Sequence, residues 1–228
     1  GDPSRVTLSL NAPDKAFVYA IGDFSDWEVD NQYFMKRDGD HWWITLDLST
    51  SRQYDFQYFV DGEIRTFDPF AHKVRSPQDA DISEAVYPGL ESYPAGKTEN
   101  LVSVIRPGQQ QNSFEFSDFQ PPPREDLVVY ELLLRDFVDQ SSFDVLADTL
   151  DYLDRLGVNA VELMPVANFG GNNSWGYNPN AHLALDKSYG TPEGFKRFVE
   201  AAHSRGIAVI MDVVYNHVTD QSPLVQLY

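Results

Sequence analysis

Residues 207–217 read Ile-Ala-Val-Ile-Met-Asp-Val-Val-Tyr-Asn-His. Such an apolar, β-branched run predicts a strand buried on both faces, the kind of strand that parallel sheets contain. The polar residues Asp212, Asn216 and His217 come at or just beyond its carboxyl end. Because a buried charge is costly unless it is paired or faces a polar site, Asp212 indicates a functional site at this end of the strand.

Two similar apolar runs precede this one, at Leu127–Leu134 and Val158–Met164. A helical pattern with a serine cap and a leucine face separates the first two runs. A second helix, which begins at Thr191-Pro192, separates Val158–Met164 from the strand Ile207–Val214. The order β-α-β-α-β predicts a parallel sheet with right-handed crossovers.

The chain has a different character before the proline run Pro121–Pro123. Short aromatic and β-branched runs alternate there with turn dipeptides such as Asp38-Gly39, a pattern typical of antiparallel strands. We therefore predict two domains, residues 1–120 and 121–228, the first an immunoglobulin-like β-sandwich. Its predicted strands are Val6–Leu10, Ala16–Ile21, Trp42–Leu48, Tyr54–Val60, Leu101–Ile105 and Ser113–Phe116.

The composition excludes several classes of function. The 228 residues include 17 basic and 35 acidic side chains, and the net charge of −18 argues against nucleic acid or an anionic membrane as partner. No apolar run reaches about 18 residues, so we expect no membrane span. The absence of cysteine excludes disulfides and thiolate chemistry. An acidic chain of this kind is consistent with a mature exported protein.

A long connection, residues 165–190, leaves the carboxyl end of the second predicted strand and is rich in glycine, amide and aromatic residues. Gly170-Gly171 could suggest a phosphate cradle, but no lysine follows and no helix begins directly afterwards. Aromatic rings and amides instead suit a neutral, hydroxyl-rich ligand such as a sugar. Trp175 and Tyr177 are the candidate contacts, and the alternative is that they only anchor the loop.

Three tryptophans in the first domain are further candidates for sugar binding. Trp42 and Trp43 are neighbours in a predicted strand, so they point to opposite faces and only one of them belongs to a core. Trp27 lies in a loop, where it either contacts a ligand or anchors the loop.

Several stretches resemble the α-amylase superfamily, glycoside hydrolase family thirteen. Asp212–His217 resembles its first signature region, and Gly22–Trp27, with Asp61-Gly62 and Asp68-Pro69, is similar to the glycogen-binding sandwich that precedes such barrels. The resemblance implies that the sandwich is followed by the first three β-strands of a (β/α)₈ TIM barrel. Stretches similar to branching-enzyme, isoamylase and pullulanase-like members are Val129–Glu131, Gly157–Pro165, Ser174–Tyr177 and Tyr189–Pro192.

The resemblance also assigns roles to individual residues. It implies that Tyr177 stacks on the glucosyl unit at subsite −1, that His217 bonds the hydroxyls of that sugar, and that Asp212 supports the site. Asn216 corresponds to an asparagine that ligates calcium in many members. One asparagine is far short of the 6–8 oxygens that calcium takes, so we expect no required cofactor.

The resemblance is incomplete where catalysis is concerned. The family's retaining mechanism uses carboxylates that follow strands four, five and seven, and two of them must lie about 5–5.5 Å apart. The chain ends at Tyr228, soon after the third predicted strand, so we expect no catalytic residue in it. Nothing in the motifs assigns that role to Glu131, Glu162 or Asp136. Buried pairing is the simpler interpretation for the two glutamates, and solvation is the simpler one for Asp136.

The sequence therefore favours the N-terminal portion of an α-glucan-active glycoside hydrolase or transferase. The alternative is a non-catalytic glucan-binding or structural module. A Rossmann-like nucleotide site is disfavoured because no glycine-rich turn follows Leu127–Leu134. Amylase, pullulanase and branching activities stay open at this point.

Overall fold

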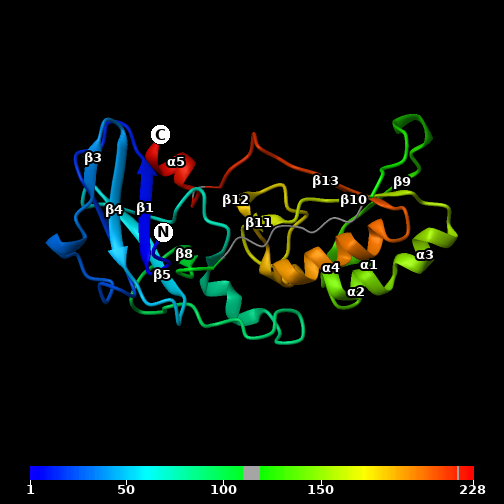
Figure 1. Ribbon diagram of the computed structural model, residues 1–228, viewed down its shortest axis with the longest axis horizontal. Coiled ribbons are helices and arrows are strands. Elements are labelled where there is room, and N and C mark those ends of the chain that lie inside the picture. Colours follow the sequence, from blue (N-terminus) through cyan, green and yellow to red (C-terminus); the bar gives the residue numbers. More distant parts are fainter. Residues whose placement is uncertain (110–118, 220) are drawn as a thin grey trace.

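The structure is a computed structural model that describes residues 1–109, 119–219 and 221–228, so the predicted strand Ser113–Phe116 lies outside the described residues. Figure 1 shows two lobes side by side, an all-β lobe formed by the first part of the chain and an α/β lobe formed by the second.

The N-terminal lobe contains two antiparallel sheets that share one hydrophobic core. One sheet has the order β1-β4-β3, and the other has the order β2-β5-β8-β7 with β6 added beside β5. The strands are β1 Arg5–Asn11, β2 Val18–Gly22, β3 Lys36–Asp38, β4 His41–Asp47, β5 Tyr54–Val60, β6 Ile64–Thr66, β7 Val74–Arg75 and β8 Val102–Ile105.

The period of two along β4 explains why this lobe has a core. Trp42, Ile44 and Leu46 are buried on one face of the strand, and they pack with residues of β2 and β5 from the other sheet. The turn predicted at Asp38-Gly39 is also present, since β3 and β4 pair directly on either side of it and Gly39 has a φ of 60°. The antiparallel two-sheet arrangement predicted for the first half is thereby confirmed.

The α/β lobe has a parallel three-stranded sheet in the order β13-β10-β9, as the sequence predicts. Each strand is four residues long, β9 Val129–Leu132, β10 Ala160–Leu163 and β13 Ala208–Met211. The helices lie on one face of this sheet in Figure 1, where their apolar residues join one core. They are α1 Leu134–Phe137, α2 Phe143–Asp148, α3 Leu150–Arg155 and α4 Pro192–His203, and α5 Pro223–Leu227 follows near the end of the chain.

Two elements differ from the prediction. The first helical pattern is divided into α2 and α3 at Thr149, whose hydroxyl donates to the Leu146 carbonyl at 2.7 Å and competes with the helical hydrogen bonds. The long connection 165–190 is not a simple loop, because β11 Ala167–Phe169 and β12 Pro179–Leu185 pair as an antiparallel ribbon within it. Its two strands shift register twice, so no clean alternation shows them in the sequence.

The two lobes are held together by buried contacts. Phe67 and Val74 of the sandwich share an apolar cluster with Ala181 and Ala184 of β12. At the other end of the chain, α5 lies beside the sandwich in Figure 1, and Leu227 is part of the sandwich core.

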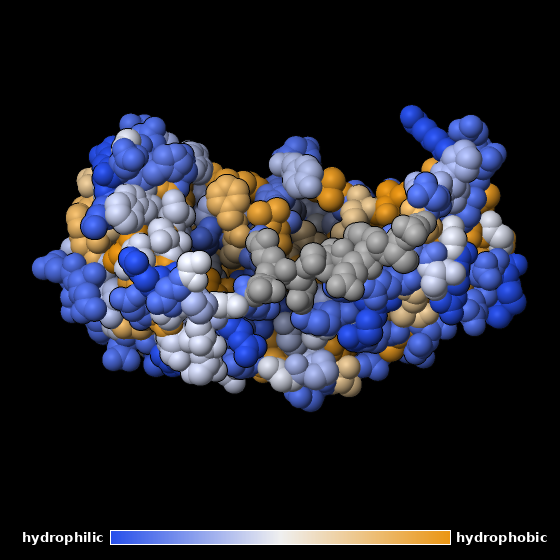
Figure 2. Space-filling view, in the orientation of Figure 1, coloured by the Kyte–Doolittle hydropathy of each residue, from blue (hydrophilic) through white to orange (hydrophobic). Residues whose placement is uncertain are grey.

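The outer face of the α/β sheet is open. Within the described residues, β9 and β13 each pair with one strand only, so both edges of the sheet are open, and Val129, Met211 and Val213 are exposed. In the space-filling view, apolar residues reach the surface along the upper side of the molecule (Figure 2). None of the helices in the described part of the chain has the length and apolar character of a membrane span.

Candidate functional site

The candidate site lies at the carboxyl ends of the parallel strands. In β10, Val161 and Leu163 belong to the core beneath the helices, so Glu162 between them faces the open side of the sheet. Asp212 follows β13 directly, and its backbone N–H donates to the Leu163 carbonyl at 3.0 Å. That bond extends the sheet by one residue and fixes the backbone of Asp212 beside β10.

Tyr177 and Asp212, which are 35 residues apart in sequence, meet at this edge. The Tyr177 hydroxyl donates to Asp212 Oδ2 at 2.6 Å. This hydrogen bond raises the pKa of Tyr177 to about 12, so the phenol stays protonated across the physiological range. The residue is 36% exposed, so part of its ring is accessible to a ligand while its hydroxyl is held.

Gly176 determines how the loop presents Tyr177. Its φ is 93°, and a Cβ at this position would lie 2.4 Å from the Pro165 carbonyl oxygen. Only glycine accommodates both the positive φ and this close approach. Next to it, Ser174 Oγ accepts from the Gly176 N–H at 3.0 Å and contacts the Asn178 side chain, which closes the turn.

Trp175 projects from the same loop and is 62% exposed. Its ring is not buried beneath the loop, so the alternative that it anchors the loop is disfavoured.

The hydrogen bond that the structure gives to His217 is through its backbone. His182 Nε2 lies 3.2 Å from the His217 carbonyl oxygen. The imidazole of His217 is exposed, and within the described residues it makes no hydrogen bond to Tyr177 or Asp212. Sequence reasoning missed His182, which is a lone histidine in β12 with no motif to mark it.

Asn216 is exposed beside His217. In the described part of the chain, no group of three or more His, Cys, Asp or Glu side chains converges in a way that could hold a metal ion. A calcium site at Asn216 therefore has no supporting acidic ligand among these residues.

The sandwich tryptophans need a correction. Trp27 is 3% exposed, and its indole N–H donates to Asp23 Oδ1 at 3.1 Å, so it anchors its loop. Trp42 is 2% exposed and donates to the Ala12 carbonyl from within the core. Neither ring offers a face to a sugar, and we do not carry these two sugar platforms further. Trp43, on the opposite face of β4, is half-buried with Lys36 Nζ 4.7 Å from its ring centroid.

The remaining carboxylates have ordinary surroundings. Glu131 and Glu162 occupy opposite register positions on β9 and β10, within the strands rather than beyond them. Asp136 pairs with Arg135, whose Nε donates at 2.8 Å, and this hydrogen bond lowers the pKa of Asp136. The solvation expected for Asp136 is present, because its side chain is 61% exposed. The buried pairing expected for Glu131 is wrong, since Glu131 is exposed and makes no ion pair among the described residues.

Comparisons with known proteins point in one direction. Residues 140–226 match the family described as "Alpha amylase, catalytic domain". The malto-oligosyltrehalose trehalohydrolase of Saccharolobus solfataricus is 37% identical over 187 residues, which are 82% of this chain and 29% of that protein. The protein of the same name from a Rhizobium species is 33% identical over 178 residues, 77% of this chain and 26% of that protein.

Solved structures show the same fold. A putative α-amylase from Salmonella typhimurium superposes with a TM-score of 0.74 at 23% identity, over 98% of this chain and 34% of that one. A pullulanase from Anoxybacillus sp. LM18-11, complexed with maltotetraose, superposes with a TM-score of 0.72 at 25% identity, over 100% of this chain and 36% of that one. The chain thus spans about a third or less of the length of these proteins. It belongs to the α-amylase superfamily, glycoside hydrolase family thirteen.

Proposed function

We propose that this chain supplies the glucosyl-binding part of an α-glucan-active glycoside hydrolase or transferase. The observation that carries the proposal is the hydrogen bond between Tyr177 and Asp212 at the carboxyl end of β13. In barrels, sites lie at this end of the sheet, and a tyrosine ring held by its hydroxyl is a rigid platform for a sugar. Asp212 is the residue that positions the platform.

A neutral α-glucan suits the surroundings of this pair. Glu131 and Glu162 lie on the open face of the neighbouring strands and would repel an anionic ligand. Trp175 adds a second accessible aromatic surface in the same loop. The relatives named malto-oligosyltrehalose trehalohydrolase, and the pullulanase complexed with maltotetraose, support an α-glucan oligosaccharide as substrate class.

The proposal gives this chain a binding role rather than the catalytic carboxylates. His217 would bond sugar hydroxyls beside Tyr177, and neither calcium nor another cofactor is required. Residues 121–228 would form the first three strands of a (β/α)₈ barrel, and residues 1–120 an immunoglobulin-like module of the glycogen-binding type. Retention of configuration would depend on carboxylates outside Gly1–Tyr228.

Titration with maltotetraose, measured by isothermal calorimetry, tests the binding role. Tyr177→Ala is expected to weaken binding by about tenfold or more, because an aromatic contact is worth about 1 kcal/mol beyond its buried area. Tyr152→Ala is the matched control, since Tyr152 is a similarly exposed tyrosine on α3. Equal affinities of the two variants would contradict the proposal.

An activity assay separates the binding role from catalysis. The 228-residue chain is expected to release no reducing sugar from starch above a mock preparation. Release by the purified chain would show that it contains its own catalytic pair. The non-catalytic alternative is distinguished by the source open reading frame, since one that ends at Tyr228 favours a binding or structural module.

A further inference from the structure

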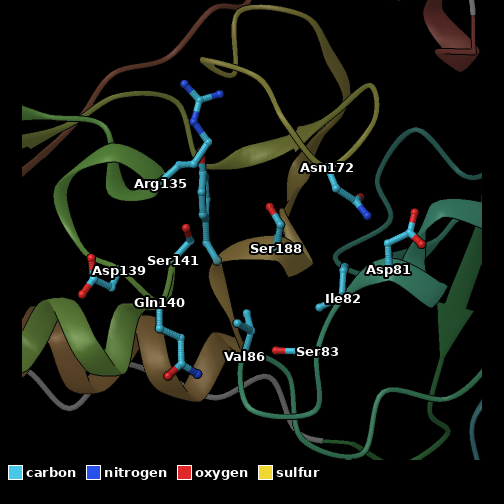
Figure 3. Close-up of a pocket in the computed structure, with 11 residues that line it drawn as sticks. Asp81, Ile82, Ser83, Val86, Arg135, Asp139, Gln140, Ser141, Asn172 and Ser188 are labelled. Atoms are coloured by element: carbon cyan, nitrogen blue, oxygen red, sulfur yellow. The ribbon is translucent and has the colours of Figure 1, made fainter.

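A cavity of about 340 Å³ lies at the junction of the two lobes, and neither Tyr177 nor Asp212 lines it. One wall is the segment 81–86 of the first lobe, and the opposite wall is the loop 139–141 between α1 and α2. Figure 3 shows Asp81 and Ile82 on one side, Gln140 and Ser141 on the other, and Ser188 between them. The volume is at the lower end of the roughly 300–1,000 Å³ of small-molecule sites.

The walls of this junction cavity are held in place by their own hydrogen bonds. Asn172 Nδ2 donates to the Gln78 carbonyl at 2.6 Å, which ties the long loop to the first lobe. Ser188 Oγ donates to Asp186 Oδ1 at 2.5 Å. Arg135 is held by Asp136 and by the side chain of Asn173. The cavity is therefore preformed, and these groups are already committed.

Other polar groups that line the cavity are uncommitted. Within the described residues, the side chains of Asp81, Asp139, Gln140 and Ser141 have no hydrogen-bond partner. Tyr189 also lines the cavity, is 2% exposed, and its hydroxyl is buried without a partner among the described residues. That hydroxyl has almost no accessible surface, so it lies behind the cavity wall, and the uncommitted side chains of Asp81, Asp139, Gln140 and Ser141 are the polar groups that a ligand would meet.

We propose that the junction cavity binds a short neutral saccharide, at a site separate from Tyr177. Asp81 and Asp139 disfavour an anion, and Arg135, the one cation among the described lining residues, is already paired with Asp136. Carboxylate, amide and hydroxyl groups suit sugar hydroxyls, while Ile82 and Val86 offer apolar surface to C–H groups. The choice of an α-glucose saccharide among neutral sugars rests on the proposed function.

The ligand bridges the two lobes in this arrangement. Asp81, Ile82 and Val86 belong to the first lobe, and Gln140 and Ser141 belong to the second. A bound saccharide therefore adds contacts across the junction, and it stabilises the folded chain by mass action.

Nuclear magnetic resonance titration with maltose tests the proposal, because it reports each site separately. Backbone amide shifts are expected at residues 139–141 and 188–189. Shifts confined to residues 175–178 and 212–217 would overturn the junction site and leave the proposed function intact. Shifts at neither segment, up to the solubility limit of maltose, would overturn the junction site and count against the proposed function in this chain.

Variants check which groups make the contact. Gln140→Ala removes one uncommitted amide from the cavity wall and is expected to weaken binding roughly two- to tenfold, the range of one net hydrogen bond. Ser83→Trp fills the cavity from an exposed position and is expected to abolish the shifts at 139–141. Ser92→Trp is the matched control at an exposed serine that does not line the cavity. Unchanged maltose affinity in both Gln140→Ala and Ser83→Trp, or the same amide shifts caused by CaCl₂ but not by maltose, would overturn the assignment.

Discussion

Lys187 Nζ lies 3.3 Å from Asp79 Oδ1, and the two side chains are only 5% and 3% exposed. Asp79 also accepts hydrogen bonds from the backbone N–H and the hydroxyl of Ser76, both at 3.1 Å. Asp79 belongs to the first lobe and Lys187 to the second, so this buried ion pair crosses the junction. A buried charge that loses its partner is strongly destabilising, which makes the pair sensitive to substitution.

Lys187→Met is expected to lower the free energy of unfolding by about 3–5 kcal/mol, because it leaves the Asp79 carboxylate buried without its counter-ion. Urea denaturation monitored by circular dichroism measures the change. Arg205→Met is the control, since its pair with Asp151 is at the surface and is worth about 0–1 kcal/mol. A loss below about 1 kcal/mol for Lys187→Met would show that the pair does not join the lobes.

Asp55 predicts how the stability depends on pH. Burial raises its pKa from 3.8 to about 7, and this effect outweighs the opposite effect of Arg75, whose Nε lies 3.3 Å from Asp55 Oδ1. The folded state thus holds this proton more tightly than the unfolded state does. The stability that this difference in pKa contributes is fully present below pH 3.8 and is lost as the pH rises toward 7.

Urea denaturation at pH 4 and pH 8 tests this expectation. From pH 4 to pH 8, the free energy of unfolding is expected to fall by roughly 2–4 kcal/mol more in the wild type than in Asp55→Asn. Asp47→Asn, which removes an exposed carboxylate in the same lobe, should keep the wild-type dependence. Parallel profiles for wild type and Asp55→Asn would contradict the raised pKa.

Trp42 and Trp43 are adjacent residues with different surroundings. Trp42→Ala is expected to lower the free energy of unfolding by about 3–5 kcal/mol. It removes a buried side chain and leaves the Ala12 carbonyl without its donor. Trp43→Ala should cost about 1 kcal/mol or less, since the ring is half-buried on the other face. Thermal unfolding of both variants measures the difference. Similar losses would mean that the burial of the two faces is misassigned.

Gly176→Ala is expected to disturb the loop that presents Tyr177. The new Cβ would lie 2.4 Å from the Pro165 carbonyl oxygen, so the backbone must move and maltotetraose binding should be lost. Gly171→Ala is the matched control, because Gly171 also has a positive φ but nothing lies within 4 Å of the Cβ that alanine would add. Calorimetric titration should therefore give an affinity near wild type for Gly171→Ala. A Gly176→Ala protein that binds normally would show that this loop geometry is not needed.

The sequence predicts elements whose side chains repeat with one clear period. The alternation in β4 and the apolar runs of β9, β10 and β13 were sufficient for the antiparallel lobe and the parallel sheet. The β11–β12 ribbon was missed because its register shifts remove the alternation. The burial of Trp27 and Trp42 could not be read from residue type, since a tryptophan suits a core and a sugar site equally.

The candidate site was predictable only in part. Tyr177 and Asp212 were identified through motifs and meet as a hydrogen-bonded pair. The junction cavity and the Lys187–Asp79 pair depend on how the two lobes pack, and residues far apart in sequence carry no local signal of such packing.

The position of Leu227 has a consequence for the order of events during synthesis. Among the described residues, the last strand of the sandwich is β8, which ends at Ile105, yet a side chain of the same core is added about 120 residues later. At roughly 5–20 residues per second, the ribosome needs about 6–24 s to make that stretch. Throughout this interval the nascent sandwich lacks one of its core residues, and the α/β lobe must emerge before the first lobe is complete.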